Sequence, residues 1–200
     1  QVCLHGTLVD VDRPVYNTPM IPHAPTARDR ILLAAHDLFY RDGVRATGID
    51  RVIAESGVAK LTFYRHFPSK NDLIRAYLDY RHQRWMAWFT EAIARHGQTP
   101  AALGRALGEW LRDPGFRGCA FLNSVSELTG ALPEVADITR AHKADMTATI
   151  AAVLPASRQR ARQAQAIAIA FDGAILRAQF DDVDAAIEAF ERITRAVLKA

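Results

Sequence analysis

Residues 48–67 read GIDRVIAESGVAKLTFYRHF, and this stretch decides the fold. Apolar residues recur at helical spacing on both sides of Gly57, which predicts a short helix up to Ser56 and a second from about Ala59 to His66. Glycine adopts the left-handed conformation that ends a helix sharply. The stretch therefore predicts a helix-turn-helix whose two helices cross on a small apolar seam. The seam residues are Val52, Ile53, Val58 and Phe63.

The second of these helices keeps one face for a partner, and that face is basic. No acidic residue occurs between Ser56 and Asn71, whereas three fixed cations do, although the formal net charge of the 200-residue chain is only +3. Side chains that bond phosphate oxygens alternate with apolar ones, as expected for a helix in the major groove of DNA. The polar residues are Lys60, Thr62, Tyr64, Arg65 and His66, followed by Lys70.

A second interpretation of the hairpin remains open at this point. An amphipathic helical pair also serves protein contacts, with Tyr64 and His66 helping to close the core and the lysines facing solvent. A related alternative is a helical protein that binds DNA without a preferred sequence. Such binding keeps its salt dependence but does not discriminate between sequences.

The segments around the hairpin also show helical spacing, so the predicted fold class is all-α with about nine helices. Thr26 is expected to cap a first helix that ends at Asp42-Gly43, and Thr47 to cap the second. Ser69 is expected to cap a long fourth helix that ends near Arg95. Prolines and glycines then separate helices near 101–112, 118–129, 134–153, 157–178 and 182–199.

Three regions follow from this pattern. Residues 1–25 are expected to be a tail or leader, since the patterned helices begin only near Thr26. Residues 26–70 are predicted to form a helix-turn-helix domain, and residues 71–200 a larger helical domain, with the long fourth helix as the joint. The opening sequence lacks the basic start and the apolar run of a signal peptide, and no stretch has the length of a membrane span.

The titratable and cysteine residues exclude several classes of protein. Cys3 and Cys119 lie far apart, which gives neither a disulfide framework nor a zinc spacing and fits a cytoplasmic protein. The Asp, Glu and His residues show no metal-ligand spacing, nucleophile elbow, phosphate loop or paired carboxylates. We therefore expect no enzymatic activity, no cofactor and no metal.

Residues 28–74 resemble the DNA-binding domain of the TetR family of transcriptional regulators. The run TFYRHFPSK at residues 62–70 is the most specific part. The resemblance implies a homodimer that binds palindromic double-stranded DNA, as a repressor, and releases it when a small-molecule effector enters the C-terminal domain. The other matching positions are Arg30, Ile31, Leu32, Ala35, Leu38, Phe39, Gly43, Thr47, Ile49, Val52, Gly57, Val58 and Lys60.

The resemblance also implies roles for individual residues in DNA binding. By their place in the motif, Lys60, Leu61, Thr62 and Arg65 are expected to face bases or nearby sugars. Phosphates are expected at Thr47, Tyr64, His66 and Lys70. Leu61 stands where Gly or Pro is often found, so it either contacts a thymine methyl group or shifts the helix, and either would alter the preferred operator.

Dimerisation in this family uses the last two long helices. A two-fold dimer of that kind has two DNA-binding domains that match a palindromic operator whose half-sites lie about 34–36 Å apart. The last two predicted helices of this chain must also pack against their own domain. Part of their apolar faces is therefore expected to lie in the core of the single chain. The residues expected at the interface are Ala164, Ala168, Phe171, Ile175, Phe190 and Ile193.

An effector pocket is expected among the fourth to eighth helices, where aromatic residues are frequent, and it favours an apolar or aromatic ligand. The Cys119 thiol, beside Arg117, is either a sensor of oxidants and electrophiles or simply a small buried residue. The polar residues Asn123, Glu127 and His142 are either anchors for a ligand or ordinary helix-surface groups. The expected lining is Trp85, Trp88, Phe89, Trp110, Cys119, Phe121 and Asn123.

Overall fold

The computed structural model describes residues 2–4, 7–9, 24–128 and 130–200. These residues form nine α-helices, which confirms the all-α class, and one short antiparallel pair of strands that joins Val2 to Val9. The strands, β1 (Val2–Leu4) and β2 (Thr7–Val9), lie within the stretch expected to be a tail, and most of the rest of that stretch lies outside the described residues. None of the helices in the described ranges is long and apolar enough to cross a membrane.

The helices follow one another with short connections. They are α1 (Ala27–Asp42), α2 (Ile49–Ser56), α3 (Lys60–His66), α4 (Lys70–Arg95), α5 (Pro100–Leu111), α6 (Ala120–Leu128), α7 (Glu134–Ala152), α8 (Arg160–Arg177) and α9 (Val183–Lys199).

Local sequence explains most helix ends. Thr26 and Asp29 form a reciprocal capping box at α1, and the Ser69 hydroxyl accepts the Asp72 N–H at the start of α4, as predicted. Pro100 opens α5 at the position where a missing N–H does no harm. The prediction that Thr47 caps α2 is wrong, because the cap residue is Gly48 and no side chain bonds the first turn.

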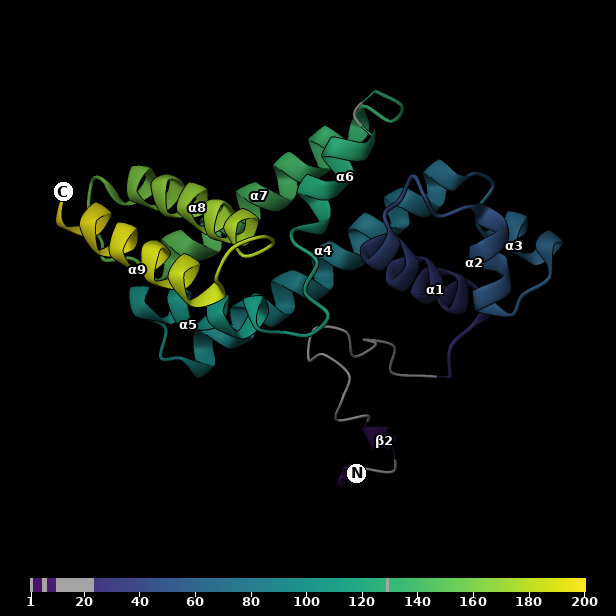
Figure 1. The fold of residues 1–200 in the computed structure, drawn as a ribbon, viewed down its shortest axis with the longest axis horizontal. Coiled ribbons are helices and arrows are strands. Elements are labelled where there is room, and N and C mark those ends of the chain that lie inside the picture. The colour runs from purple at the N-terminus through teal and green to yellow at the C-terminus, as the bar shows by residue number, and fades with distance from the viewer. Residues whose placement is uncertain (1, 5–6, 10–23, 129) are drawn as a thin grey trace.

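The long helix α4 joins two groups of helices (Figure 1). One end of α4 packs against α1, beside α2 and α3, and the other end packs against α5. Helices α6 and α7 also contact α4, whereas α8 and α9 pack mainly on each other and on α7 and α5. The helix-turn-helix is therefore held at one end of the molecule, and α8 and α9 lie at the other.

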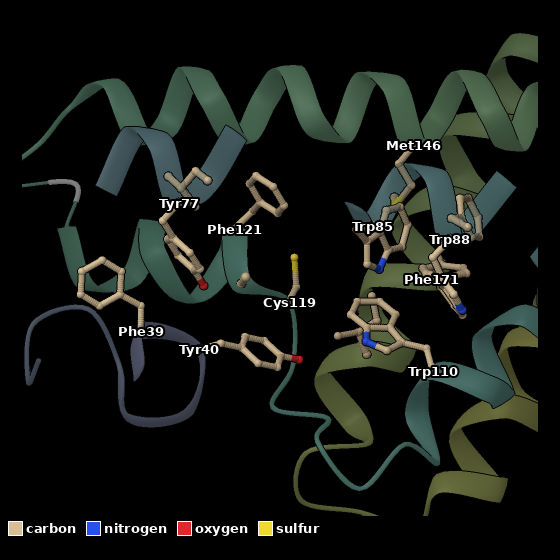
Figure 2. Close-up of a cluster of buried hydrophobic side chains, with 14 of the residues drawn as sticks. Phe39, Tyr40, Tyr77, Trp85, Trp88, Trp110, Cys119, Phe121, Met146 and Phe171 are labelled. Atoms are coloured by element: carbon tan, nitrogen blue, oxygen red, sulfur yellow. The ribbon is translucent and has the colours of Figure 1, made fainter. Parts of the chain in front are cut away.

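The core contains two neighbouring aromatic groups along α4 (Figure 2). Between them lies His142 of α7, whose ring stacks on Phe121 at 3.7 Å between centroids and approaches Trp85 at 5.2 Å. Its Nδ1 lies 3.1 Å from Nδ1 of His82. Burial, helped by the nearby Lys143, lowers the pKa of His142 to about 2. The first group includes Phe39, Tyr77 and Phe121, and the second Trp85, Trp88, Trp110 and Phe171.

This buried histidine predicts acid sensitivity. In the unfolded chain His142 takes up a proton below about pH 6.5, whereas in the folded protein it stays neutral down to a pKa of about 2, so stability is lost as pH falls from 6.5. From pH 7 to 5 this one residue should lower the free energy of unfolding by about 2 kcal/mol. Urea titrations at both pH values should show that the drop is smaller by that amount in His142→Phe, and an equal drop in both proteins would contradict the assignment.

Candidate nucleic-acid interface

Helices α2 and α3 meet at a sharp glycine turn. Gly57 has φ 63° and ψ 29°, the left-handed conformation expected from the sequence. Val52 of α2 and Phe63 of α3 are fully buried, and Ile53 and Val58 pack against the same core. The apolar seam predicted from residues 52–63 is therefore confirmed, and it fixes which face of α3 points outward.

The outward face of α3 carries the residues predicted to meet DNA. Leu61 is 74% exposed, the largest exposed fraction among the large hydrophobic side chains of the described residues, and Tyr64 is 39% exposed. Lys60 and Arg65 are exposed, while Thr62 and His66 are half-buried. The Tyr64 ring makes an edge-to-face contact with the buried Phe63 ring, at 5.2 Å between centroids, although it is not part of the core. The face thus has one exposed apolar residue among cations and hydrogen-bonding groups.

Two cations beside α3 differ in how they are held. Lys60 has its ammonium 3.4 Å from the Asp50 carboxylate, an exposed pair that water screens strongly. Lys70 is half-buried and donates a hydrogen bond of 2.6 Å to the Val44 carbonyl, and burial lowers its pKa. Lys70 therefore fastens the start of α4 to the loop after α1, with its ammonium less available than that of Lys60.

Sequence patterns missed one cation at this surface. The Arg28 guanidinium, from the first turn of α1, lies 5.1 Å from the centroid of the Phe67 ring at the end of α3. It is exposed, and α1 is separated from α3 by more than a helix in the sequence. Only the packing of α1 against α3 brings this charge beside the basic face.

Thr47 does not belong to this surface. Its side chain is fully buried, and its hydroxyl donates a 2.8 Å hydrogen bond to the Gly43 carbonyl. This corrects the expectation that the Thr47 side chain contacts phosphate. The hydroxyl instead closes the loop that connects α1 to α2.

Replacing Thr47 with valine tests this structural role. Valine keeps the shape but removes the donor, so Thr47→Val should lower the free energy of unfolding by about 1–2 kcal/mol, measured by urea denaturation. The folded variant should bind DNA as the parent does. Unchanged stability together with weakened DNA binding would restore the phosphate-contact role.

The residues expected to line an effector pocket lie mostly in the core of this structure. Trp85, Trp88, Phe89, Trp110, Cys119 and Phe121 are buried, and the Trp85 ring stacks on Phe89 at 4.6 Å and approaches Trp110 at 5.3 Å. Asn123 is separate from them, and its amide donates to the Arg117 carbonyl. It borders a cavity of about 230 Å³ between α1, α4 and α6, together with Tyr40, Tyr77 and Glu127.

Glu127 connects α6 to the helix-turn-helix. Its carboxylate accepts a 2.7 Å hydrogen bond from the Arg45 N–H in the loop between α1 and α2. It also lies 3.2 Å from where a Cβ on Gly43 would be, and Gly43 has φ 89°, so this loop has room only for glycine. His142, also a possible anchor, is buried against Phe121.

The residues expected at a dimer interface also need correction. Ala164, Ala168, Phe171, Ile175 and Phe190 are buried within the single chain, where the Phe171 ring contacts Phe89 and Phe190 at 5.4 and 5.5 Å between centroids. Ile193 alone of the set is exposed, at 44%. The larger apolar faces of α8 and α9 pack inside the chain. The outward apolar residues of these helices and the turn between them are Ile169, Leu176, Phe180 and Ile193, which we call the α8–α9 stripe.

The fold and the basic face of α3 define a helix-turn-helix DNA-binding protein. Residues 31–77 match the family described as bacterial regulatory proteins, tetR family. The structure is similar to that of a TetR-family transcriptional regulator from Streptomyces coelicolor, with 34% identity, a TM-score of 0.75 and coverage of 86% of this chain and 94% of the other. The chain belongs to the TetR family of transcriptional regulators, which are DNA-binding transcription factors and not enzymes.

Two further relatives are informative. A curated relative from Lactococcus lactis subsp. lactis, described as an uncharacterized HTH-type transcriptional regulator, is 26% identical over 107 residues; the match spans 51% of this chain and about half, 55%, of the relative. A cysteine mutant of the TetR-family regulator CifR, solved with 26-bp double-strand operator DNA, has the same fold. It shows 19% identity, a TM-score of 0.70 and coverage of 88% of this chain and 98% of the other.

Proposed function

We propose that this regulator is a cytoplasmic repressor that binds a palindromic operator as a homodimer and releases it when a small apolar or aromatic ligand binds the C-terminal domain. The observation that carries the proposal is the outward face of α3. It combines an exposed apolar side chain, Leu61, with cations and hydroxyls held on a fixed helix. That combination suits base edges and phosphates in a major groove.

Each side chain of the face has a proposed part in DNA binding. Bases are assigned to four residues of α3, of which three lie in its first turn and Arg65 lies in its last turn. The three are Lys60, Leu61 and Thr62. The phosphate contacts are assigned to Tyr64, His66 and Lys70, with Arg28 added from α1. Arginine and lysine give most of the affinity, because each neutralised phosphate releases counterions.

The dimer is proposed to form through the α8–α9 stripe. A groove of about 310 Å³ runs beside it, lined by Ile193 of the stripe and by Gly173, Ala185 and Ala189, whose small side chains let a partner helix approach closely. The stripe lies at the opposite end of the molecule from α3 (Figure 1), so a two-fold pair would carry one α3 on each arm.

Release by ligand is proposed to act on the spacing of the two α3 helices. α4 packs against α1 at one end and carries Trp85 and Phe89 at the other, so a ligand that separates the aromatic core would shift α4. The Glu127 bond to the Arg45 N–H gives α6 a second contact with the same domain.

The test is selection of DNA from a random pool by the purified protein at two salt concentrations. Enrichment of one palindrome, weakened by salt, would support the repressor proposal and supply the operator for effector screening. DNA recovered without a preferred sequence, and weakened by salt, would favour sequence-independent binding, and recovery of no DNA above background would favour a protein-interaction role.

Leu61 makes a specific prediction about that operator. Its exposed side chain should pack on a thymine methyl group, so replacing that thymine with deoxyuridine, which lacks only the methyl, should weaken binding by about fivefold. The Leu61→Ala variant should lose affinity for the thymine operator and become insensitive to the replacement. Equal sensitivity in parent and variant, measured by fluorescence anisotropy, would show that Leu61 does not read this base.

A further inference from the structure

A cavity of about 490 Å³ lies between the start of α5 and the outer side of α9. These two helices pack side by side at the end of the molecule away from α3 (Figure 1). The apolar part of the wall comes from Pro100, Phe190 and Leu198. The volume falls in the range of small-molecule sites. The polar part of the wall comes from Thr99, Arg105, Glu191, Thr194 and Arg195.

One buried hydroxyl group in this wall makes no hydrogen bond to any described residue of the protein. Thr194 is 5% exposed, and across the described residues its hydroxyl has no hydrogen-bond partner. Proteins pair nearly all buried polar groups, because an unpaired one lowers stability by about 1–3 kcal/mol. An unpaired hydroxyl in the wall of a cavity therefore points to a ligand that supplies the partner.

The electrostatics of the cavity favour an anion. The positive end of the 12-residue helix α5 borders the cavity, because Thr99, Pro100 and Ala101 are part of its wall. The side chain of the cap residue Thr99 does not bond the first turn. Arg105 and Arg195 also line it, and Glu191 is the one acidic side chain in its wall. Two cations and one anion leave a net charge of +1, which a single negative charge balances.

The Glu191 side chain lies between Arg195 and α5. The Glu191 carboxylate lies 3.5 Å from Arg195 and directly against Gly104 of α5. A Cβ on Gly104 would come within 2.6 Å of Glu191 Oε1. Glycine at 104 therefore gives the Glu191 side chain a place beside α5, where it partly neutralises Arg195. Arg105 has a backbone partner, the His96 carbonyl at 3.0 Å, and keeps its charge for a ligand.

We propose that this cavity is a binding site for a small monocarboxylic acid with a hydrocarbon body. The carboxylate of the ligand binds at the start of α5, beside Arg105, and accepts a hydrogen bond from the Thr194 hydroxyl. The hydrocarbon body packs on Phe190 and Leu198. The wall formed by Glu191, Thr194 and Leu198 lies on a different side of α9 from Ile193 of the α8–α9 stripe, because these three residues follow one another at i, i+3 and i+7. Phe190 borders both this cavity and the groove beside the stripe. The cavity touches the aromatic core only through Phe190, which packs on Phe171, and it is separate from the DNA-binding face.

Calorimetric titration of the full chain with octanoate tests the proposal, with 1-octanol as the neutral probe. Octanoate should bind more tightly than octanol. Thr194→Val, which removes only the hydroxyl, and Arg105→Gln, which removes the charge, should each weaken octanoate binding about fivefold or more. The matched controls Thr149→Val and Arg158→Gln, at sites outside the cavity, should bind octanoate as the parent does.

Thermal unfolding of the same variants separates binding from folding. Because the Thr194 hydroxyl is unpaired, Thr194→Val should melt at or above the temperature of the parent. Equal affinity for octanoate and octanol, or unchanged affinity in both cavity variants, would overturn the proposal. Since no DNA is present, a negative result would leave the repressor proposal intact.

Discussion

The Lys60→Ala, Tyr64→Ala double variant is expected to lose operator affinity by at least about a hundredfold without losing its fold. A hydrogen bond to a charged group contributes about 1.5–3 kcal/mol and a neutral one about 1, and 2.7 kcal/mol corresponds to a factor of a hundred. Both side chains are exposed on α3, and the pair that Lys60 makes with Asp50 is exposed and weak. The chain should therefore keep its melting temperature.

Salt dependence distinguishes loss of contacts from loss of structure. Fluorescence anisotropy over a range of salt concentrations should show that the slope of log affinity against log salt falls by about one for each DNA half-site occupied, since one cation per protomer is removed. Lys199→Ala, at the end of α9, removes the same charge far from α3 and should change neither affinity nor slope. A double variant that binds like the parent would show that α3 is not the recognition helix.

Helix α3 and its basic face could be predicted from the sequence because their signals are local. The glycine turn, the buried Phe63 and the run of cations without an acidic residue all lie within one short segment. Helix ends elsewhere followed from Thr26, Ser69 and Pro100 for the same reason. Each depends on hydrogen bonds between residues a few positions apart, and such patterns are visible in a single sequence.

Thr47 and Arg28 required the structure. Threonine before a helix favours the cap position, yet here the loop turns its hydroxyl back onto the Gly43 carbonyl and leaves the cap to Gly48. Arg28 reaches the end of α3 only because α1 packs against it. Neither arrangement has a local signal, since both depend on where the loop and the first helix lie in the folded domain.

The apolar stripes of α8 and α9 show a different limit. Both helices have an inward and an outward apolar face, and helical periodicity identifies such faces without saying which one packs inside the chain. The bulky Phe171 and Phe190 fill the core, whereas the outward faces combine glycine and alanine with a few exposed hydrophobic residues. Large aromatic side chains bury more area, so they belong to the core when a helix offers a choice.

The double variant Leu176→Arg, Ile193→Arg, on the outward faces of α8 and α9, is expected to be a monomer. These side chains are 58% and 44% exposed, so the changes should leave the fold of one chain intact while placing like charges on both sides of a two-fold interface. Operator affinity should fall at least about a hundredfold, because each half-site is then bound independently. Sedimentation at micromolar concentration measures the oligomeric state, and anisotropy with whole and half operators measures the loss.

Phe171→Ala, a substitution in the core, is the control for the two arginine substitutions in the α8–α9 stripe. Phe171 is fully buried against Phe89 and Phe190, so its truncation should lower the free energy of unfolding by about 3–5 kcal/mol. The folded fraction should nevertheless sediment like the parent, because the α8–α9 stripe is unchanged. If instead Phe171→Ala produced folded monomers and the double arginine variant remained dimeric, the two copies would meet through some other surface, and the proposed spacing of the α3 helices would have to be abandoned with it.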